Sequence, residues 1–241
     1  MKAGKRIGVV IPALDEEPAI GRVIADIPDW VDQIVVADNG SRDATAAIAV
    51  AGGATVVREP ERGYGAACLK GIAALREIDI VVFLDGDYSD HPQEMALLVD
   101  PIVEGEADMV IGSRITSRLA RGALTPQQRF GNWLACRLIA RFWCVHYTDL
   151  GPFRAISSAA LGSLAMVDRN YGWTVEMQIK AAQHNLRMRE APVSYRPRIG
   201  VSKVSGTIKG TVLAGYTILR VIGQAAWRAS RAATADHHST R

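Results

Sequence analysis

Residues 78–87 read Ile-Asp-Ile-Val-Val-Phe-Leu-Asp-Gly-Asp, an apolar run that ends in two aspartates one residue apart. An apolar run of this length with β-branched side chains predicts a strand over 78–84 that is buried on both faces. Strands buried on both faces are typical of parallel sheets covered by helices. The run therefore indicates an α/β fold and places Asp85 and Asp87 at the carboxyl end of a central strand.

The chain on both sides of this run alternates between strand and helix patterns. Further strands are expected at 6–11, 33–37, 54–57 and 109–111, and helices at 18–27, 43–51, 64–75 and from Pro92 onward. After Thr125 the pattern predicts a long helix over 126–142, an irregular stretch, helices near Ser158 and Val175, and a strand over 188–195. This order predicts a mostly parallel sheet flanked by helices.

The sequence shows no internal repeat and no linker, so a single domain is expected over residues 1–228. Within it, residues 1–115 read as a nucleotide-binding half and residues 116–228 as an acceptor-binding half. Residues 229–241 are expected to be a disordered tail.

Composition narrows the function classes. The net charge of +3 comes from 28 basic and 25 acidic residues, a balance that does not indicate nucleic-acid binding. The three cysteines form no CxxC pair and read as reduced thiols of a cytoplasmic protein. The N-terminus has no secretory signal pattern, and no run of about 18 uncharged apolar residues predicts a transmembrane helix.

Candidate functional residues follow the predicted strands at the edge where ligands bind in open α/β sheets. They are Pro12, Ala13, Asp15 and Glu16 after the first strand, Asp38, Gly40 and Ser41 after the second, Asp85, Gly86 and Asp87 after the fourth, and Arg114 after the fifth. Asp85 and Asp87 repel each other unless a cation lies between them, and oxygen ligands suit Mg²⁺ or Mn²⁺. The alternative is a polar turn whose aspartates cap the helix after Pro92.

Glycines and basic residues supply further candidates. Gly63 and Gly65 open the helix at 64–75, either to let a nucleotide approach the backbone or to allow tight helix packing. Arg129 and Asn132 lie one helical turn apart, so both side chains are able to face one ligand. Arg154 follows Asp149 closely, which suits a structural ion pair as well as a substrate contact. Lys203 lies in a small-residue segment, 199–206, with the composition of a mobile lid.

The ordered set of motifs resembles the family 2 glycosyltransferases of the GT-A (Rossmann-like) fold, of the polyprenyl-phosphate (dolichyl-phosphate) mannosyl/glucosyltransferase type. The motifs are IPALDEE at 11–17, VVADNGSRDAT at 35–45, FLDGDYSDHP at 83–92, GSR at 112–114 and TDLGPFRAI at 148–156. The resemblance implies that Pro12, Ala13 and Glu16 line the nucleotide and that Asp38 contacts base or ribose. It implies that Asp85 faces ribose and cation, that Asp87 binds the cation, and that Arg114, Arg129 and a basic lid residue hold phosphates. Ser89 stands where relatives often carry Gln.

These features predict a metal-dependent, inverting transfer of a sugar from a UDP- or GDP-sugar to polyprenyl phosphate. A divalent ion and arginines would neutralise the departing diphosphate. A hydroxyl acceptor would need a general base, for which Asp149 is the candidate. The other hypotheses are a nucleotidyltransferase, disfavoured by the acidic, glycine-free loop 12–17, and a non-catalytic sugar-nucleotide-binding protein.

The last predicted helix, 207–227, places Ile208, Val212, Tyr216, Leu219, Ile222 and Ala226 near one face. One interpretation is a helix that docks on the protein's own core or on a second copy in a homo-oligomer. The other is an interfacial helix that gives peripheral contact with the inner face of the membrane.

Overall fold

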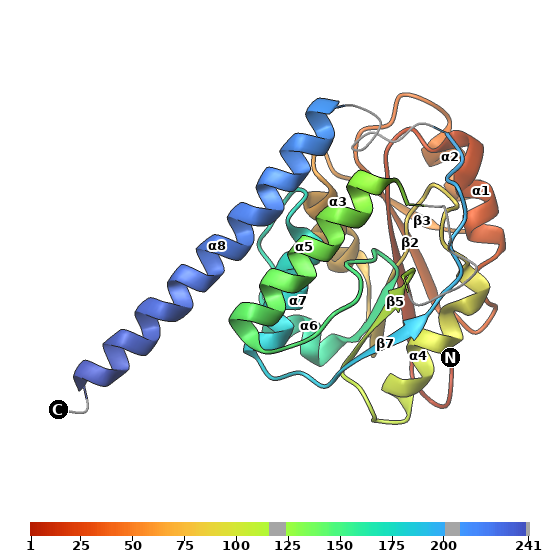
Figure 1. Cartoon of the computed structure of the whole chain (residues 1–241). Helices are drawn as coiled ribbons and strands as arrows, with labels where there is room; N and C mark the ends of the chain where they lie inside the picture. The colour runs from red at the N-terminus through yellow and green to blue at the C-terminus, as the bar shows by residue number, and fades with distance from the viewer. Residues whose placement is uncertain (116–123, 201–207, 240–241) are drawn as a thin grey trace.

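A computed structural model describes residues 1–115, 124–200 and 208–239 of the chain. One seven-stranded sheet forms its centre, in the order β3-β2-β1-β4-β6-β5-β7 (Figure 1). The strands are β1 Ile7–Ala13, β2 Gln33–Asp38, β3 Thr55–Arg58, β4 Ile80–Phe83, β5 Met109–Ser113, β6 Arg154–Ser157 and β7 Met188–Pro192. Only β6 runs antiparallel to its neighbours, β4 and β5. The predicted single α/β domain with a mostly parallel sheet is confirmed.

Helices cover both faces of this sheet. They are α1 Glu17–Ala25, α2 Thr45–Ala51, α3 Tyr64–Ala74, the 3₁₀ turn η1 Pro92–Met95 with α4 Ala96–Val103, α5 Pro126–Trp143, α6 Ser158–Leu164, α7 Trp173–Gln183 and α8 Ile208–Ser239. Side chains of α1, α2 and α4 join one hydrophobic cluster, whereas those of α3 and α5 to α8 join a second on the opposite face. Val82 belongs to the first cluster and Val81 to the second, as the alternation of side chains along a strand requires.

The strand β6 was not predicted. Its four residues, Arg-Ala-Ile-Ser, follow a glycine-proline turn and run directly into α6, for which Ser157 is the N-cap. Such a segment is too short to show a periodic pattern by itself. In the sheet it pairs with both β4 and β5, and Phe83 lies opposite Arg154. Strands from both predicted halves of the chain therefore share one sheet.

The carboxyl ends of the parallel strands meet at one edge. Ala13 at the end of β1 lies beside Asp38 at the end of β2, and Val10 lies beside Phe83 of β4. Because β6 begins where β4 and β5 end, the loop that precedes β6 reaches the same edge. The predicted site residues thus come from neighbouring loops.

The final helix differs from the prediction in two ways. It continues to Ser239, into the segment predicted to be a disordered tail, where the alanine-rich composition favours helix. The predicted apolar face is also split, because Ile222 is buried whereas Tyr216 and Leu219 are 64% and 44% exposed. The packed face instead carries Ile218, Val221, Ile222 and Ala225. Within the described residues, no helix is long and apolar enough to cross a membrane.

The start of α3 packs against the loop that precedes α7. A Cβ on Gly65 would overlap the backbone carbonyl of Asp168, which cannot move without shifting the loop. We expect Gly65→Ala to lower the free energy of unfolding by about 2–3 kcal/mol because of this overlap. Urea denaturation measures the change.

The control is Gly162→Ala in α6, where an added Cβ would meet no atom within 4 Å. This substitution is expected to be neutral or to stabilise the protein by up to about 1 kcal/mol, because alanine favours helix over glycine. Equal stability of Gly65→Ala and the wild type would contradict the close packing.

Candidate functional site

Three aspartates gather on the turn after β4. The hydroxyl of Tyr64 donates to Asp85 Oδ1 at 3.0 Å, and the backbone N–H of Asp85 donates to Asp90 Oδ2 at 3.3 Å. Asp87 Oδ1 accepts from both the backbone N–H and the hydroxyl of Ser89, at 2.9 and 2.6 Å. The turn is therefore held by its own polar groups, with the carboxylates of Asp85, Asp87 and Asp90 facing a common region.

The negative charges of these carboxylates repel one another. Burial, followed by the charge of Asp87, raises the pKa of Asp85 to about 6. Burial and the charges of Asp85 and Asp87 raise the pKa of Asp90 well above its usual range. Asp90 Oδ1 is buried and has no hydrogen-bond partner among the described residues. A cation at this turn would relieve the repulsion.

The donor set fits a hard divalent cation. Asp85 and Asp87 offer carboxylate oxygens, which Mg²⁺ and Mn²⁺ prefer. In the described part of the chain, no group of three or more His, Cys, Asp or Glu side chains is arranged to hold a metal alone. Ser89 is buried and donates its hydroxyl to Asp87, so it supports a ligand instead of replacing the Gln of relatives. The remaining ligands would have to be water and diphosphate oxygens.

The alternative in which these aspartates cap the helix after Pro92 finds no support in the geometry. The 3₁₀ turn η1 begins after His91 without a side-chain cap, so none of the three aspartates caps it. Asp90 accepts from the backbone of Asp85 instead.

Arg198 is a site residue that was not among the predicted ones. Its guanidinium donates to Glu16 Oε1 at 2.9 Å, and it lies 3.3 Å from Asp87 Oδ2. Its Nε is buried without a hydrogen-bond partner in the described residues. Arg198 therefore supplies positive charge at Asp87 and joins the segment after β7 to the loop after β1. Sequence spacing gave no signal for this contact, which joins residues 182 positions apart.

The loops after β1 and β2 are joined by hydrogen bonds between the predicted donor-binding residues. The backbone N–H of Asp15 donates to Ser41 Oγ at 3.0 Å, and Asp38 Oδ1 accepts from the N–H of Ser41 at 2.9 Å. Gly40 adopts a φ of 84°, which favours glycine at this turn. Gly86 lies against Pro12 and Ala13, so the turn after β4 adjoins these loops. The structure thus brings together the predicted residues of 12–16, 38–41 and 85–87.

Gly63 has a packing role in the structure. A Cβ there would overlap the carbonyl of Arg169, and its N–H donates to Asn39 Oδ1 at 2.8 Å. Asn39 also donates to the carbonyls of Glu59 and Glu61, which makes it the organiser of this loop. The geometry therefore favours tight packing over the predicted nucleotide contact for Gly63.

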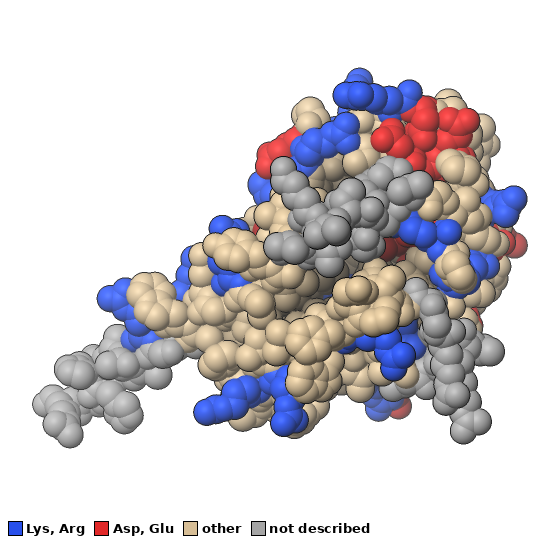
Figure 2. Space-filling model, turned by 45° about the horizontal axis from the view of Figure 1, so that its top comes forward, with Lys and Arg blue, Asp and Glu red and all other residues tan. Residues whose placement is uncertain are grey.

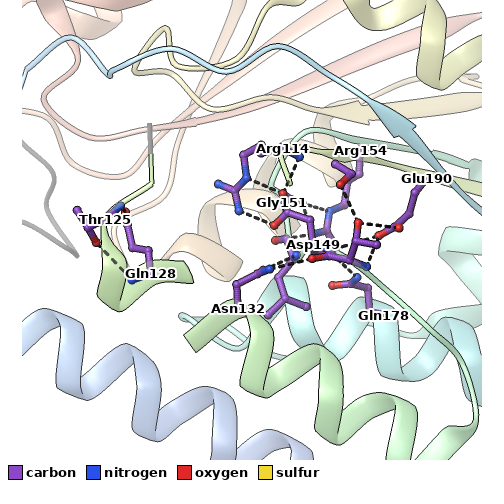
Figure 3. A network of polar contacts seen from close by, with 12 residues as sticks. Arg114, Thr125, Gln128, Asn132, Asp149, Gly151, Arg154, Gln178 and Glu190 are labelled. Carbon is purple, nitrogen blue, oxygen red and sulfur yellow. Dashed lines mark hydrogen bonds and ion pairs between the residues drawn. The ribbon is translucent and has the colours of Figure 1, made fainter. Parts of the chain in front are cut away.

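Arg114 and Asp149 form the second polar centre of the site (Figure 3). Arg114 Nε donates to Asp149 Oδ2 and Nη2 donates to Oδ1, both at 2.8 Å, and the backbone N–H of Arg114 also donates to Oδ2. Asp149 is fully buried. Burial lowers the pKa of the Arg114 guanidinium, but the charge and hydrogen bonds of Asp149 outweigh this effect and raise it. The pair fixes the orientation of Arg114, whose Nη1 forms no hydrogen bond within the described residues.

Two predicted acceptor residues hold the loop around Asp149 instead (Figure 3). Arg154 is fully buried and donates to the backbone carbonyls of Leu150, Gly151 and Thr174. Burial lowers the pKa of Arg154 to about 10. Asn132 donates to the carbonyl of Thr148 and accepts from the N–H of Leu150. These contacts favour structural roles for both residues.

Arg129 remains a candidate for ligand binding. It is exposed on α5 and lines a groove of about 920 Å³ together with Trp133, Arg137, His146 and Thr148. Thr148 precedes Asp149, so the groove adjoins the Arg114 pair. Lys203, the predicted lid residue, lies outside the described residues.

The acidic turn, the loops after β1 and β2 and the Arg114–Asp149 pair all lie at the edge of the sheet where open α/β folds bind ligands. Residues 8–162 match the glycosyl transferase family 2. The chain belongs to this family and is a glycosyltransferase with the expected GT-A fold.

Several proteins are similar to this chain in sequence or fold. The chain is 38% identical over 224 residues to an uncharacterized glycosyltransferase of Mycobacterium tuberculosis, covering 91% of this chain and 99% of the relative. It is 33% identical over 221 residues to the dolichyl-phosphate hexose transferase of Haloferax volcanii, covering 89% and 93%. Glucosyl-3-phosphoglycerate synthase from M. tuberculosis, crystallised with Mn²⁺, UDP and glucosyl-3-phosphoglycerate, superposes with a TM-score of 0.72 at 30% identity, covering 92% and 81%.

The raised pKa of Asp85 gives a prediction for the metal-free protein. A carboxyl whose pKa is raised on folding favours the folded state below its unfolded pKa, and this contribution is lost as the pH rises through about 6. We expect Asp85→Asn to stabilise the metal-free protein by roughly 2–3 kcal/mol at neutral pH and much less near pH 4. Thermal unfolding with a chelator at both pH values measures this.

Added Mn²⁺ is the control for this prediction. It should stabilise the wild type against heat and leave Asp85→Asn unchanged. Equal melting temperatures of variant and wild type at neutral pH without metal would contradict the repulsion.

The contact of Arg198 with Asp87 predicts competition with a cation. We expect Arg198→Gln to bind Mn²⁺ alone about tenfold more tightly, because a positive charge near Asp87 is removed. The same variant should bind UDP with Mn²⁺ more weakly, because the diphosphate loses a charged donor. Titration calorimetry measures both affinities.

Arg198→Lys, which keeps the charge, is the matched variant and should stay close to the wild type for Mn²⁺ alone. Unchanged Mn²⁺ affinity in Arg198→Gln would show that the arginine does not oppose the cation.

Proposed function

We propose that the protein transfers a hexose from a UDP-sugar to the phosphate of a polyprenyl phosphate, with inversion at the sugar carbon. Mg²⁺ or Mn²⁺ would be held by Asp85 and Asp87, and the enzyme would work in the cytoplasm at the inner face of the membrane. Similarity to the dolichyl-phosphate hexose transferase of Haloferax volcanii supports the acceptor, and structural neighbours crystallised with UDP and Mn²⁺ support the donor and the cation.

The donor side follows from the acidic turn and the adjoining loops. The loops at 12–16 and 38–41 would hold the nucleoside, and Asp85 would face the ribose and the cation. When bound, a divalent cation supplies positive charge to the departing diphosphate. Arg198 would exchange Glu16 and Asp87 for the diphosphate oxygens, since a guanidinium is able to bind two oxygens of a phosphate as it binds those of a carboxylate.

One observation carries the choice of acceptor: both oxygens of buried Asp149 are bound by Arg114. The carboxylate predicted to act as general base is therefore occupied and shielded from solvent. An acceptor that is already ionised needs no base, and a phosphate is ionised near neutral pH. Arg114 Nη1 and Arg129 would hold this phosphate.

The reaction then involves no proton transfer. A phosphate oxygen attacks C1 of the sugar and forms the new C–O bond. The bond from C1 to the diphosphate breaks, and its electron pair leaves with UDP. Asp149 serves as a positioning residue, because it fixes the guanidinium of Arg114.

A second candidate acceptor is the hydroxyl group of a small phosphorylated molecule. Glucosyl-3-phosphoglycerate synthase from M. tuberculosis was crystallised with phosphoglyceric acid, and that structure superposes with a TM-score of 0.74. The same arginines would suit the phosphate of such an acceptor. Family membership leaves the nucleotidyltransferase and the binding-protein hypotheses without support.

The decisive experiment compares three acceptors with UDP-glucose and Mn²⁺: a short-chain polyprenyl phosphate, the corresponding polyprenol and 3-phosphoglycerate. We expect transfer to the polyprenyl phosphate only, no transfer in EDTA, and a loss of at least about a hundredfold in Asp87→Ala. Arg129→Ala should raise the KM for the acceptor about tenfold or more and leave the KM for the donor unchanged.

Circular dichroism of Asp87→Ala would show that its fold is intact. Transfer to 3-phosphoglycerate without transfer to the lipid phosphate would refute the proposed acceptor and favour the second candidate. Full activity of Asp87→Ala in EDTA would refute the metal assignment.

A further inference from the structure

Helices α5 and α8 expose an unusual set of side chains. They lie side by side on the same face of the sheet (Figure 1). All the strongly exposed aromatic residues of the described chain lie on these two helices: Phe130, Trp133, Phe142, Tyr216 and Trp227. Exposed clusters of aromatic residues are uncommon on a protein without a partner and mark interaction sites.

The exposed residues form a row along each helix. On α5, Phe130, Trp133, Arg137 and Arg141 recur at helical spacing and are all exposed. On α8, Tyr216, Arg220, Trp227 and Arg231 do the same. We call these two rows the α5–α8 surface.

Packing within the protein does not require these rows. The core contacts of α5 and α8 use other residues, such as Cys136 and Ile139 on α5 and Ile218 and Ile222 on α8. The aromatic rings contact residues of their own row instead. The ring centroids of Phe130 and Trp133 lie 5.9 Å apart, and Arg231 Cζ lies 4.6 Å from the ring centroid of Trp227. The rows are therefore available to a partner.

The charge of the surface indicates which partner fits. Residues 126–143 and 208–231 contain arginine and lysine but not one aspartate or glutamate. Six exposed arginines lie on these stretches, and none forms an ion pair within the described residues: Arg129, Arg137, Arg141, Arg220, Arg228 and Arg231. In Figure 2 the left side of the molecule shows mainly basic and uncharged side chains, whereas acidic side chains gather toward the top.

A second copy of the chain is a poor match for this surface. Pairing it with itself would bring arginines together without acidic partners, which costs free energy. An anionic lipid bilayer offers both complements, because its headgroups attract arginines and its interface accepts Trp, Tyr and Phe side chains.

The groove lined by Arg129 and Trp133 connects this surface with the catalytic edge. It runs along α5 from Phe130 and Arg137 to Thr148, beside the Arg114–Asp149 pair. A lipid whose chain lies in the bilayer would be able to place a phosphate at Arg114 through such a groove.

We propose that the α5–α8 surface docks the enzyme on anionic lipid bilayers, with the groove open toward the membrane. The role of this docking in catalysis rests on the proposed lipid-phosphate acceptor, but membrane binding itself can be tested without any reaction. The protein lies on the membrane and does not span it. Its binding combines insertion of aromatic side chains with attraction of arginines to anionic headgroups.

The test is cosedimentation of the full chain with vesicles of phosphatidylcholine, with and without about one third phosphatidylglycerol. We expect binding only to the anionic vesicles and release by salt. The double substitution Tyr216→Ser with Trp227→Ser should weaken binding about tenfold or more. Its matched control is Val50→Ser with Leu97→Ser, which removes exposed apolar groups from α2 and α4 and should bind like the wild type.

A second pair of variants tests the charge. Arg220→Gln with Arg228→Gln should weaken binding to anionic vesicles, whereas Lys5→Gln with Lys70→Gln, exposed elsewhere, should not. If both pairs of substitutions weakened vesicle binding equally, binding would depend on net charge alone, and the α5–α8 surface would not be the docking site.

Two further measurements separate this inference from the proposed function. If the surface docks on membranes, Tyr216→Ser with Trp227→Ser should slow transfer to vesicle-embedded polyprenyl phosphate and leave transfer to a dispersed short-chain acceptor unchanged. Wild-type vesicle binding without turnover on any polyprenyl phosphate would refute the acceptor alone. Absence of vesicle binding, or a dimer in analytical ultracentrifugation that the α8 variants dissociate, would overturn the docking.

Discussion

The repulsion among three aspartates on the turn after β4 is the constraint on which the site depends. Asp85 and Asp90 carry raised pKa values because they are buried beside each other and beside Asp87. Arg198 provides a positive charge 3.3 Å from Asp87 and also binds Glu16. This arrangement links the loop after β1, the turn after β4 and the segment after β7, so binding of a cation and a diphosphate would affect all three together.

In the Arg114–Asp149 pair, a buried carboxylate holds a positively charged guanidinium in a fixed orientation. Both oxygens of Asp149 are bound by the Arg114 guanidinium, so the carboxylate orients the arginine but is not available to accept a proton from a substrate. The surrounding loop is held by Asn132, Arg154 and Glu190, which bind its backbone. The structure therefore shows a fixed guanidinium on Asp149, the carboxylate that was the candidate base for a hydroxyl acceptor. This arrangement is the basis of the proposal that the acceptor is an already ionised phosphate.

Sequence patterns located the edge of the sheet correctly because they report where apolar strands end. The loops after β1, β2 and β4 do meet there, with Asp38 beside Ala13 and Gly86 against Pro12. Patterns failed where long-range hydrogen bonds decide a role. Arg154 and Asn132 have the right type and spacing for acceptor binding, but backbone groups occupy them, and Arg198 reaches Glu16 across most of the chain. The short strand β6 and the split face of α8 depend likewise on partners that no local pattern reveals.

In the proposed function, the two faces of the sheet would serve different substrates. The loops that would hold the donor adjoin α1 and α2, whereas the groove and the α5–α8 surface belong to the opposite face. The acidic turn and Arg114 lie at the edge between them, at the ends of β4 and β5. The proposed substrates, a water-soluble nucleotide sugar and a lipid phosphate, would then approach from different sides and meet at this edge. In-line displacement requires such opposed approaches, because the acceptor must attack the sugar from the side away from the departing diphosphate.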